Sequence, residues 1–258
     1  MTAARTVRPR AEASAAMQRA AAFVESAGDE VAIGRARVSI GAQPASAVVE
    51  QLRDLGPEPS VSRLLRTLGI FDDLGCSSAT PVERACDLLT AAQRGDGSWS
   101  DREDAPEDEQ IFATGMIAGY LAKTPFVRQP ILASAADYLA ARWDPDRVKG
   151  SAWGATAAYF HCFALVRHEQ ADAILQWCGR ELERGFLTGV YDAVRTARVF
   201  ALCKAHALPG SRLAAPELVA RILDEQMDDG GYASPGDSSN RARVAQTLDA
   251  LVALEHLA

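Results

Sequence analysis

The chain has 258 residues, of which 48% are hydrophobic and 24% are charged, and its formal net charge is −7 at pH 7. This length and composition are typical of a soluble globular protein with one large domain or two small ones. The negative net charge disfavours a surface that binds nucleic acid. The sequence contains no run of about 18 apolar residues, which is the length needed to span a bilayer. Five cysteines without a CxxC pair are typical of reduced thiols, so we expect a cytoplasmic protein.

The N-terminal part of the chain has the least regular pattern. Residues 1–12 are basic and no apolar segment of a secretory signal follows them. We therefore expect a flexible tail that precedes one folded domain over 13–258. The alanine-rich residues 13–26 predict a first helix, whereas residues 31–40 have the strand-like character that the remainder of the chain lacks.

Helical signals dominate the rest of the sequence. A helix pair over 46–55 and 60–68 precedes a start signal at Thr80, whose side chain can cap a helix while Glu83 completes a capping box. The helix that begins there runs to about Gln93. Further helices are predicted over residues 107–122, 130–142, 152–167, 169–183, 189–206, 213–227 and 240–257.

Two glycine loops follow one template, in which a glutamine, a glycine and an aromatic residue have the same spacing. One loop holds Gln93, Gly97 and Trp99, and the other holds Gln226, Gly230 and Tyr232. The two loops are separated by roughly three times 44 residues, and degenerate versions lie between them, which is the signature of a repeat architecture.

The predicted helices alternate between two kinds. One kind ends in a glycine loop, and the other opens with small residues beside a threonine, at Thr114, Thr156, Thr196 and Thr247. Small residues allow neighbouring helices to approach closely. The alternation therefore predicts an all-α fold, an α/α toroid of about five helix pairs in two concentric layers, with an N-terminal extension.

The glycine loop and the threonine-bearing helix after it resemble the repeat of squalene/hopene cyclases and protein prenyltransferase β-subunits. The resemblance is clearest over residues 80–258. It implies that Gln93 and Gln226 tie the outer helices together rather than take part in catalysis. Trp153 and Tyr191 hold the aromatic place in loops that lack the glutamine.

The catalytic signatures of that superfamily are missing. The chain has no D-x-D-D acid motif, and His161 beside Cys162 has no Asp-x-Cys partner that would complete a zinc site. We therefore predict no metal and no cofactor. The acidic residues 101–109 indicate a solvated loop or an acidic rim of the cavity, and cation binding there is left open.

In this fold the entrances of the inner helices face a central cavity, so we select candidate site residues there. The candidates for catalysis are Asp192, His161 and Glu109, and those for substrate binding are Trp153, Tyr159, Tyr191, Arg195, Arg243 and Gln246. Asp192 and Arg195 are three residues apart and form either a surface ion pair or the polar end of an apolar pocket. His161 and the aromatic residues are explained equally well by core packing.

The resemblance implies a divergent terpenoid-cyclase-like enzyme that cyclises or isomerises a hydrophobic polyene or isoprenoid-derived small molecule. One alternative is a non-catalytic protein that binds a hydrophobic ligand or acts as a scaffold. Another is a prenyltransferase β-like subunit that needs an α partner. We expect no nucleic-acid partner, and we leave open peripheral membrane contact, the oligomeric state and whether the chain is an enzyme.

Overall fold

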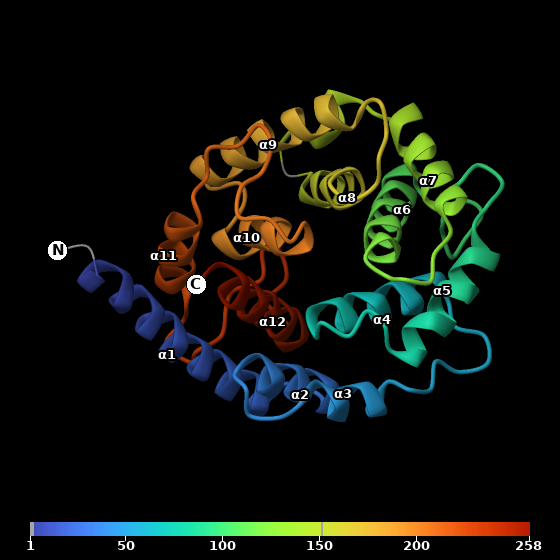
Figure 1. The fold of residues 1–258 in the computed structure, drawn as a ribbon. Helices are drawn as coiled ribbons and strands as arrows, with labels where there is room; N and C mark the ends of the chain where they lie inside the picture. The colour runs from blue at the N-terminus through green and yellow to red at the C-terminus, as the bar shows by residue number, and fades with distance from the viewer. Residues whose placement is uncertain (1–2, 151) are drawn as a thin grey trace. The chain divides into compact units, whose positions relative to one another are not determined.

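A computed structural model describes residues 3–150 and 152–258, and within these ranges the chain is helical and contains no strand (Figure 1). The all-α prediction is therefore confirmed. The elements are α1 (Ala3–Ala27), α2 (Glu30–Ser39), α3 (Ala45–Gln51), α4 (Val61–Asp73), α5 (Thr80–Ala92), α6 (Glu107–Ala122), α7 (Gln129–Ala141), the 3-10 turn η1 (Pro145–Val148), α8 (Trp153–Phe163), α9 (Ala171–Leu187), α10 (Ala193–Leu202), α11 (Ala215–Glu225) and α12 (Asn240–Leu257). None of the described helices is both long and apolar enough to cross a membrane.

The chain divides into two compact units, where the sequence predicts one domain. The middle unit comprises Val49–Val190 and Pro209–Ser211. The terminal unit comprises the chain up to Val48 together with Tyr191–Leu208 and Arg212–Ala258. Each unit therefore contains one complete glycine loop, Gln93–Trp99 in the middle unit and Gln226–Tyr232 in the terminal unit.

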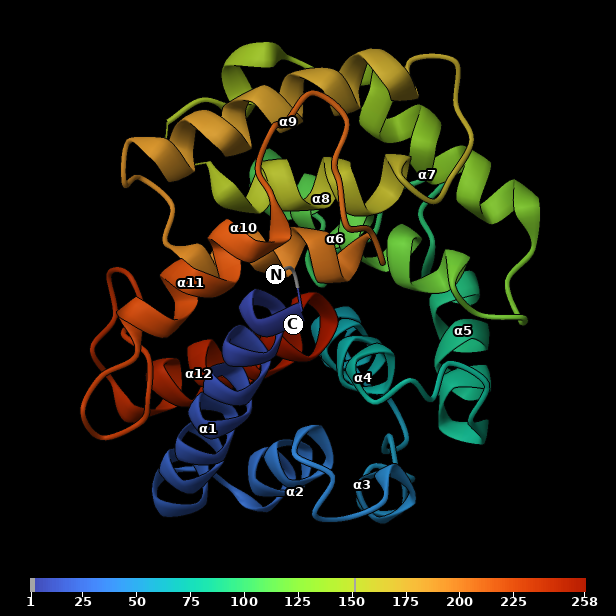
Figure 2. The same cartoon turned by 60° about the vertical axis from the view of Figure 1, so that its left-hand side comes forward.

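In the middle unit, α6 and α8 pack against each other along much of their length, with α7 against α6 and α9 against α8 (Figures 1 and 2). Two glycines of α6 make this close approach possible. A Cβ atom on Gly115 would lie 2.5 Å from the carbonyl oxygen of Ala158, and one on Gly119 would lie 2.3 Å from the ring of His161. The expectation that small residues let neighbouring helices approach closely is thus confirmed.

In the terminal unit, α12 packs against α10, α11, α1 and α2. Figures 1 and 2 show α1 next to α12. The structure assigns residues 3–12 to α1, although the sequence predicts a tail there. Residues 31–40 were expected to be strand-like, and this prediction is wrong: Asp29 caps a helix by accepting a hydrogen bond of 2.8 Å from the Ala32 amide.

The two glycine loops make the same hydrogen bonds. The side-chain amide of Gln93 donates to the carbonyl of Gly97, at 3.0 Å, and to that of Ile131 in α7, at 2.9 Å. The amide of Gln226 donates to the carbonyl of Gly230, at 2.9 Å, and to that of Ala16 in α1, also at 2.9 Å. Each glutamine therefore closes its own loop and fixes a neighbouring helix.

The aromatic residue of each loop is tied to a threonine of the next helix. The backbone amide of Trp99 donates to Thr114 Oγ1, and that of Tyr232 donates to Thr247 Oγ1, both at 3.1 Å. The rings differ in their polar contacts. Trp99 Nε1 donates to the Leu89 carbonyl at 2.7 Å, whereas the buried Tyr232 hydroxyl has no hydrogen-bond partner among the described residues.

The loop glycines have left-handed backbones pressed against the neighbouring helix. Gly97 has a φ of +90°, and a Cβ atom there would lie 2.2 Å from the Ser134 carbonyl of α7. Gly230 has a φ of +86°, and its Cβ would lie 2.4 Å from the Arg19 carbonyl of α1. Helix α1 thus packs against the loop after α11 in the same way as α7 packs against the loop after α5.

Candidate functional site

The predicted site residues are divided between the two units. Asp192, Tyr191, Arg195, Arg243 and Gln246 belong to the terminal unit, and Glu109, Trp153, Tyr159 and His161 belong to the middle unit. Within the terminal unit, the N-terminal end of α10 gathers Asp192, Arg195, Gln246 and one further residue, Glu225. We call these four residues the α10 entrance.

Asp192 is the N-cap residue of α10 and the centre of the α10 entrance. Its Oδ1 accepts a hydrogen bond from the backbone amide of Arg195 and another from the side-chain amide of Gln246 in α12, both at 2.8 Å. Its Oδ2 lies 3.7 Å from Nε of Arg195, so the two side chains form an ion pair. Tyr191, the residue before the cap, is buried.

Glu225, the last residue of α11, was not among the candidates. Its carboxylate accepts a hydrogen bond from the backbone amide of Ala193, at 3.0 and 3.3 Å from the two oxygens, and lies 3.4 Å from Arg221. Burial raises the pKa of Glu225 and the negative charge of Asp192 adds to this rise, while the Ala193 amide and Arg221 oppose it. The signal available in the sequence is its position directly before Gln226, the glutamine to which the resemblance gives a structural role.

The α10 entrance therefore holds two carboxyl groups at one helix N-terminus. The exposed backbone amides and the helix dipole stabilise negative charge there, which favours keeping at least one carboxylate ionised. Like charges at short range disfavour ionising both. A carboxyl with a raised pKa beside a second carboxylate is an arrangement that can hold a proton and release it to a bound molecule.

Arg243, predicted to bind substrate, is engaged in a structural contact. Its Nη2 donates to both carboxylate oxygens of Asp229 at 2.8 and 2.7 Å, and its guanidinium lies 4.5 Å from the ring of Phe23 in α1. In the other glycine loop, Arg142 lies 3.8 Å from Asp96 and its guanidinium is 3.8 Å from the Tyr138 ring. In both loops an arginine stacked on an aromatic ring pairs with the loop aspartate.

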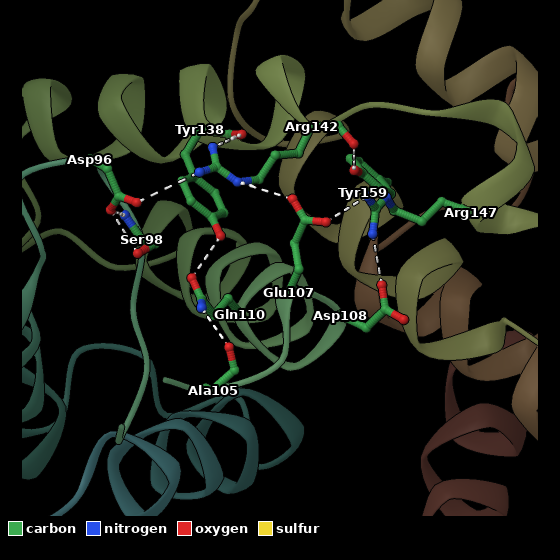
Figure 3. A network of polar contacts seen from close by, with 10 residues as sticks. All are labelled: Asp96, Ser98, Ala105, Glu107, Asp108, Gln110, Tyr138, Arg142, Arg147 and Tyr159. Carbon is green, nitrogen blue, oxygen red and sulfur yellow. Dashed lines mark hydrogen bonds and ion pairs between the residues drawn. The ribbon is translucent and has the colours of Figure 1, made fainter. Parts of the chain in front are cut away.

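Figure 3 shows the polar network at the start of α6 in the middle unit. Glu107 lies between two arginines, 3.5 Å from Arg142 and 2.7 Å from Arg147, and Arg147 also pairs with Asp108 at 2.9 Å. The buried Tyr159 hydroxyl donates to the Arg142 carbonyl at 3.1 Å, and burial raises the pKa of this phenol. The hydroxyl of Tyr159 thus serves to hold the end of α7.

Within the acidic segment 101–109, contacts to protein groups are made by Asp101, Glu107, Asp108 and Glu109. Besides the pairs of Glu107 and Asp108, Asp101 accepts hydrogen bonds from the Ser62 amide at 3.2 and 3.3 Å. Glu109 is 65% exposed and lies 3.7 Å from Arg102, which makes it part of a solvated ion pair of little energetic weight.

His161 and Trp153 lie in the body and at the start of α8. His161 is fully buried, and its ring meets Tyr120 edge to face with centroids 4.5 Å apart. Trp153 is the first residue of α8 and is half-buried.

Burial raises the pKa of Cys162, which follows His161, to about 12, and this keeps the thiol protonated. Among the residues that the structure describes, no group of three or more His, Cys, Asp or Glu side chains is placed to hold a metal ion.

Comparisons with known proteins add no relative from which a function could be transferred. No protein-family model matches this sequence, and no curated protein matches it either. The function must therefore be argued from the matching contacts of the two glycine loops and from the α10 entrance.

Proposed function

We propose that the chain is a divergent terpenoid-cyclase-like enzyme built as an α/α toroid of about five helix pairs. Its substrate is a hydrophobic polyene or another isoprenoid-derived small molecule, which it cyclises or isomerises. The observation that supports the fold is the contact-by-contact equivalence of the two glycine loops, each of which ties its threonine-bearing helix and a neighbouring helix together.

The α10 entrance supplies the acid in this proposal. Glu225 is the proton donor in this proposal: burial raises the pKa of its carboxyl, and the negative charge of Asp192 adds to this rise. The proton passes from the Glu225 carboxyl to a carbon of a substrate double bond, which forms a C–H bond and leaves a carbocation. Loss of a proton from a neighbouring carbon returns the proton to a carboxylate, so the net reaction is a rearrangement.

A solvent-isotope experiment tests this reaction. The purified protein is incubated in D₂O with a panel of linear polyenes, and products are analysed by gas chromatography and mass spectrometry for a shifted retention time and added deuterium. E225Q should abolish incorporation of deuterium, and D192N, which removes the charge that adds to the raised pKa of Glu225, should reduce it. E217Q, at an exposed position of the same helix, should leave it unchanged. Unchanged incorporation in E225Q would refute the assignment of Glu225.

A specific observation also supports the second candidate, a non-catalytic hydrophobic-ligand-binding or scaffold protein. Several predicted site residues make contacts that explain them structurally: Tyr159, His161, Arg243 and Glu109. Native mass spectrometry of freshly purified protein separates the candidates. A retained ligand that is recovered without chemical change or deuterium supports a binding protein, and the absence of both ligand and polyene binding supports a scaffold. Bound zinc in an elemental analysis would favour the prenyltransferase β-like alternative.

A further inference from the structure

In the terminal unit, the chain after α10 meets the last turn of α12 through a pair of stacked imidazole rings. The rings of His206 and His256 have centroids 4.9 Å apart and planes inclined by 2°. His256 Nε2 lies 2.9 Å from the carbonyl oxygen of Ala205, and since a carbonyl only accepts, Nε2 is the donor. We call His206 and His256 the histidine stack.

The backbone that delivers His206 to this position is strained. Lys204, with a φ of +52°, is the one residue other than glycine in the described chain that has a left-handed backbone. Side chains disfavour this conformation, so the turn needs contacts beyond itself to persist. The Ala205 amide donates back to the Phe200 carbonyl at 3.0 Å. The histidine stack adds a contact between this turn and α12.

Charged groups on the packed elements are of both signs. They are Lys204 in the turn itself, Glu255 in α12, Arg10 of α1, which donates to the Ala258 carbonyl, and the pair of Arg198 and Asp249 between α10 and α12. The charge of the histidine stack itself depends on how many of its two rings carry a second proton.

We propose that the histidine stack is a pH-sensitive latch that holds segment 203–208 against the end of α12. The latch is closed when at most one ring is protonated, because an imidazolium can stack on a neutral ring. Protonation of both rings puts two positive charges face to face and opens it. Across 4.9 Å in water this repulsion changes the opening equilibrium by about fourfold. Histidine takes up its second proton between about pH 8 and pH 5.

The geometry disfavours a metal site at the same place. Ring nitrogens carry their lone pairs in the plane of the ring, so two parallel stacked rings direct these lone pairs side by side instead of toward one point. His256 also uses Nε2 to donate to Ala205. The latch follows from these contacts alone and does not depend on the proposed enzymatic activity.

Hydrogen exchange followed by mass spectrometry tests the latch in the full chain. Exchange is measured at pH 7.5 and pH 5.5 and corrected for the intrinsic rate at each pH. The opening equilibrium measured for peptides covering 203–208 should rise at the lower pH, by at most about fourfold, whereas peptides covering the Gln93–Trp99 loop should not change.

Two variants make this test specific. H206F keeps a stacked ring without a titratable nitrogen and should abolish the pH response of segment 203–208. H168Q removes a histidine of the middle unit and should leave the response unchanged. If H206F fails to fold, H206Q, which also lacks the titrating ring, should show a pH-independent open segment. A pH response that survives in the folded His206 variant would overturn the proposal, as would protection of the segment by added zinc at pH 7.5.

Discussion

The carbonyls of Ala16 in α1 and Ile131 in α7 accept equivalent hydrogen bonds, each of 2.9 Å, from the glutamine side chains of the two glycine loops. The two acceptors are followed by the same burial pattern: Ala20, Ala21, Phe23 and Val24 are buried in α1 as Ala135, Ala136, Tyr138 and Leu139 are in α7. Helix α1 therefore packs beside the glycine loop that follows α11, as α7 packs beside the glycine loop that follows α5.

Replacement of either glutamine should destabilise its own unit. Gln226→Ala removes the side-chain amide that donates to the carbonyls of Ala16 and Gly230, and Gln93→Ala removes the one that donates to Ile131 and Gly97. Each change should lower the free energy of unfolding by about 1–3 kcal/mol in urea titrations. Hydrogen exchange of α1 should accelerate in Gln226→Ala and stay as in the wild type in Gln93→Ala; equal acceleration in both would contradict the local role.

Gly230 should tolerate a side chain far less well than another left-handed glycine. Gly230→Ala combines a φ of +86° with a Cβ atom 2.4 Å from the Arg19 carbonyl, while Gly236 has a φ of +80° and open space around its Cβ position. Gly236→Ala should cost about 1–2 kcal/mol from backbone conformation alone. Gly230→Ala should cost more, because α1 must also move. Similar thermal midpoints for the two variants would argue against close packing of α1.

The two loop aromatics should respond differently to phenylalanine. Tyr232→Phe removes a buried hydroxyl that has no hydrogen-bond partner in the described structure, so the free energy of unfolding should stay within about 1 kcal/mol of the wild type or rise. Trp99→Phe leaves the Leu89 carbonyl without its donor and creates a cavity, which should cost about 3 kcal/mol. Denaturant titration of both variants measures the contrast, and a larger loss in Tyr232→Phe would show that its hydroxyl is bonded.

Glu225 should make stability depend on pH with a defined sign. Its pKa in the folded protein is raised above the ordinary 4.5, so the protonated form favours folding and this contribution is lost as pH rises from about 4.5 through the raised value. In E225Q the amide oxygen can still accept from Ala193, but the titration is gone. The wild type should therefore lose stability relative to E225Q as the pH rises above 4.5 in denaturant titrations, and a pH-independent difference would refute the raised pKa.

Much of this protein is determined by its sequence alone, because the relevant interactions are local. The helix positions after residue 80 follow from apolar periodicity, and both glycine loops follow from backbones that L side chains avoid at Gly97 and Gly230. The prediction for residues 31–40 was wrong because a ten-residue pattern does not separate a short strand from a capped helix of small residues.

The tertiary structure decided which distant groups meet. Ala16 and Gln226 are 210 residues apart, and nothing local to either indicates that α1 packs beside the loop that follows α11. Glu225 reaches the amide of Ala193 across 32 residues, and burial at that contact, which no sequence pattern reports, raises its pKa. Periodicity determines which face of a helix is buried, but the partner of that face, and hence the chemistry of a side chain on it, is fixed only when the helices pack.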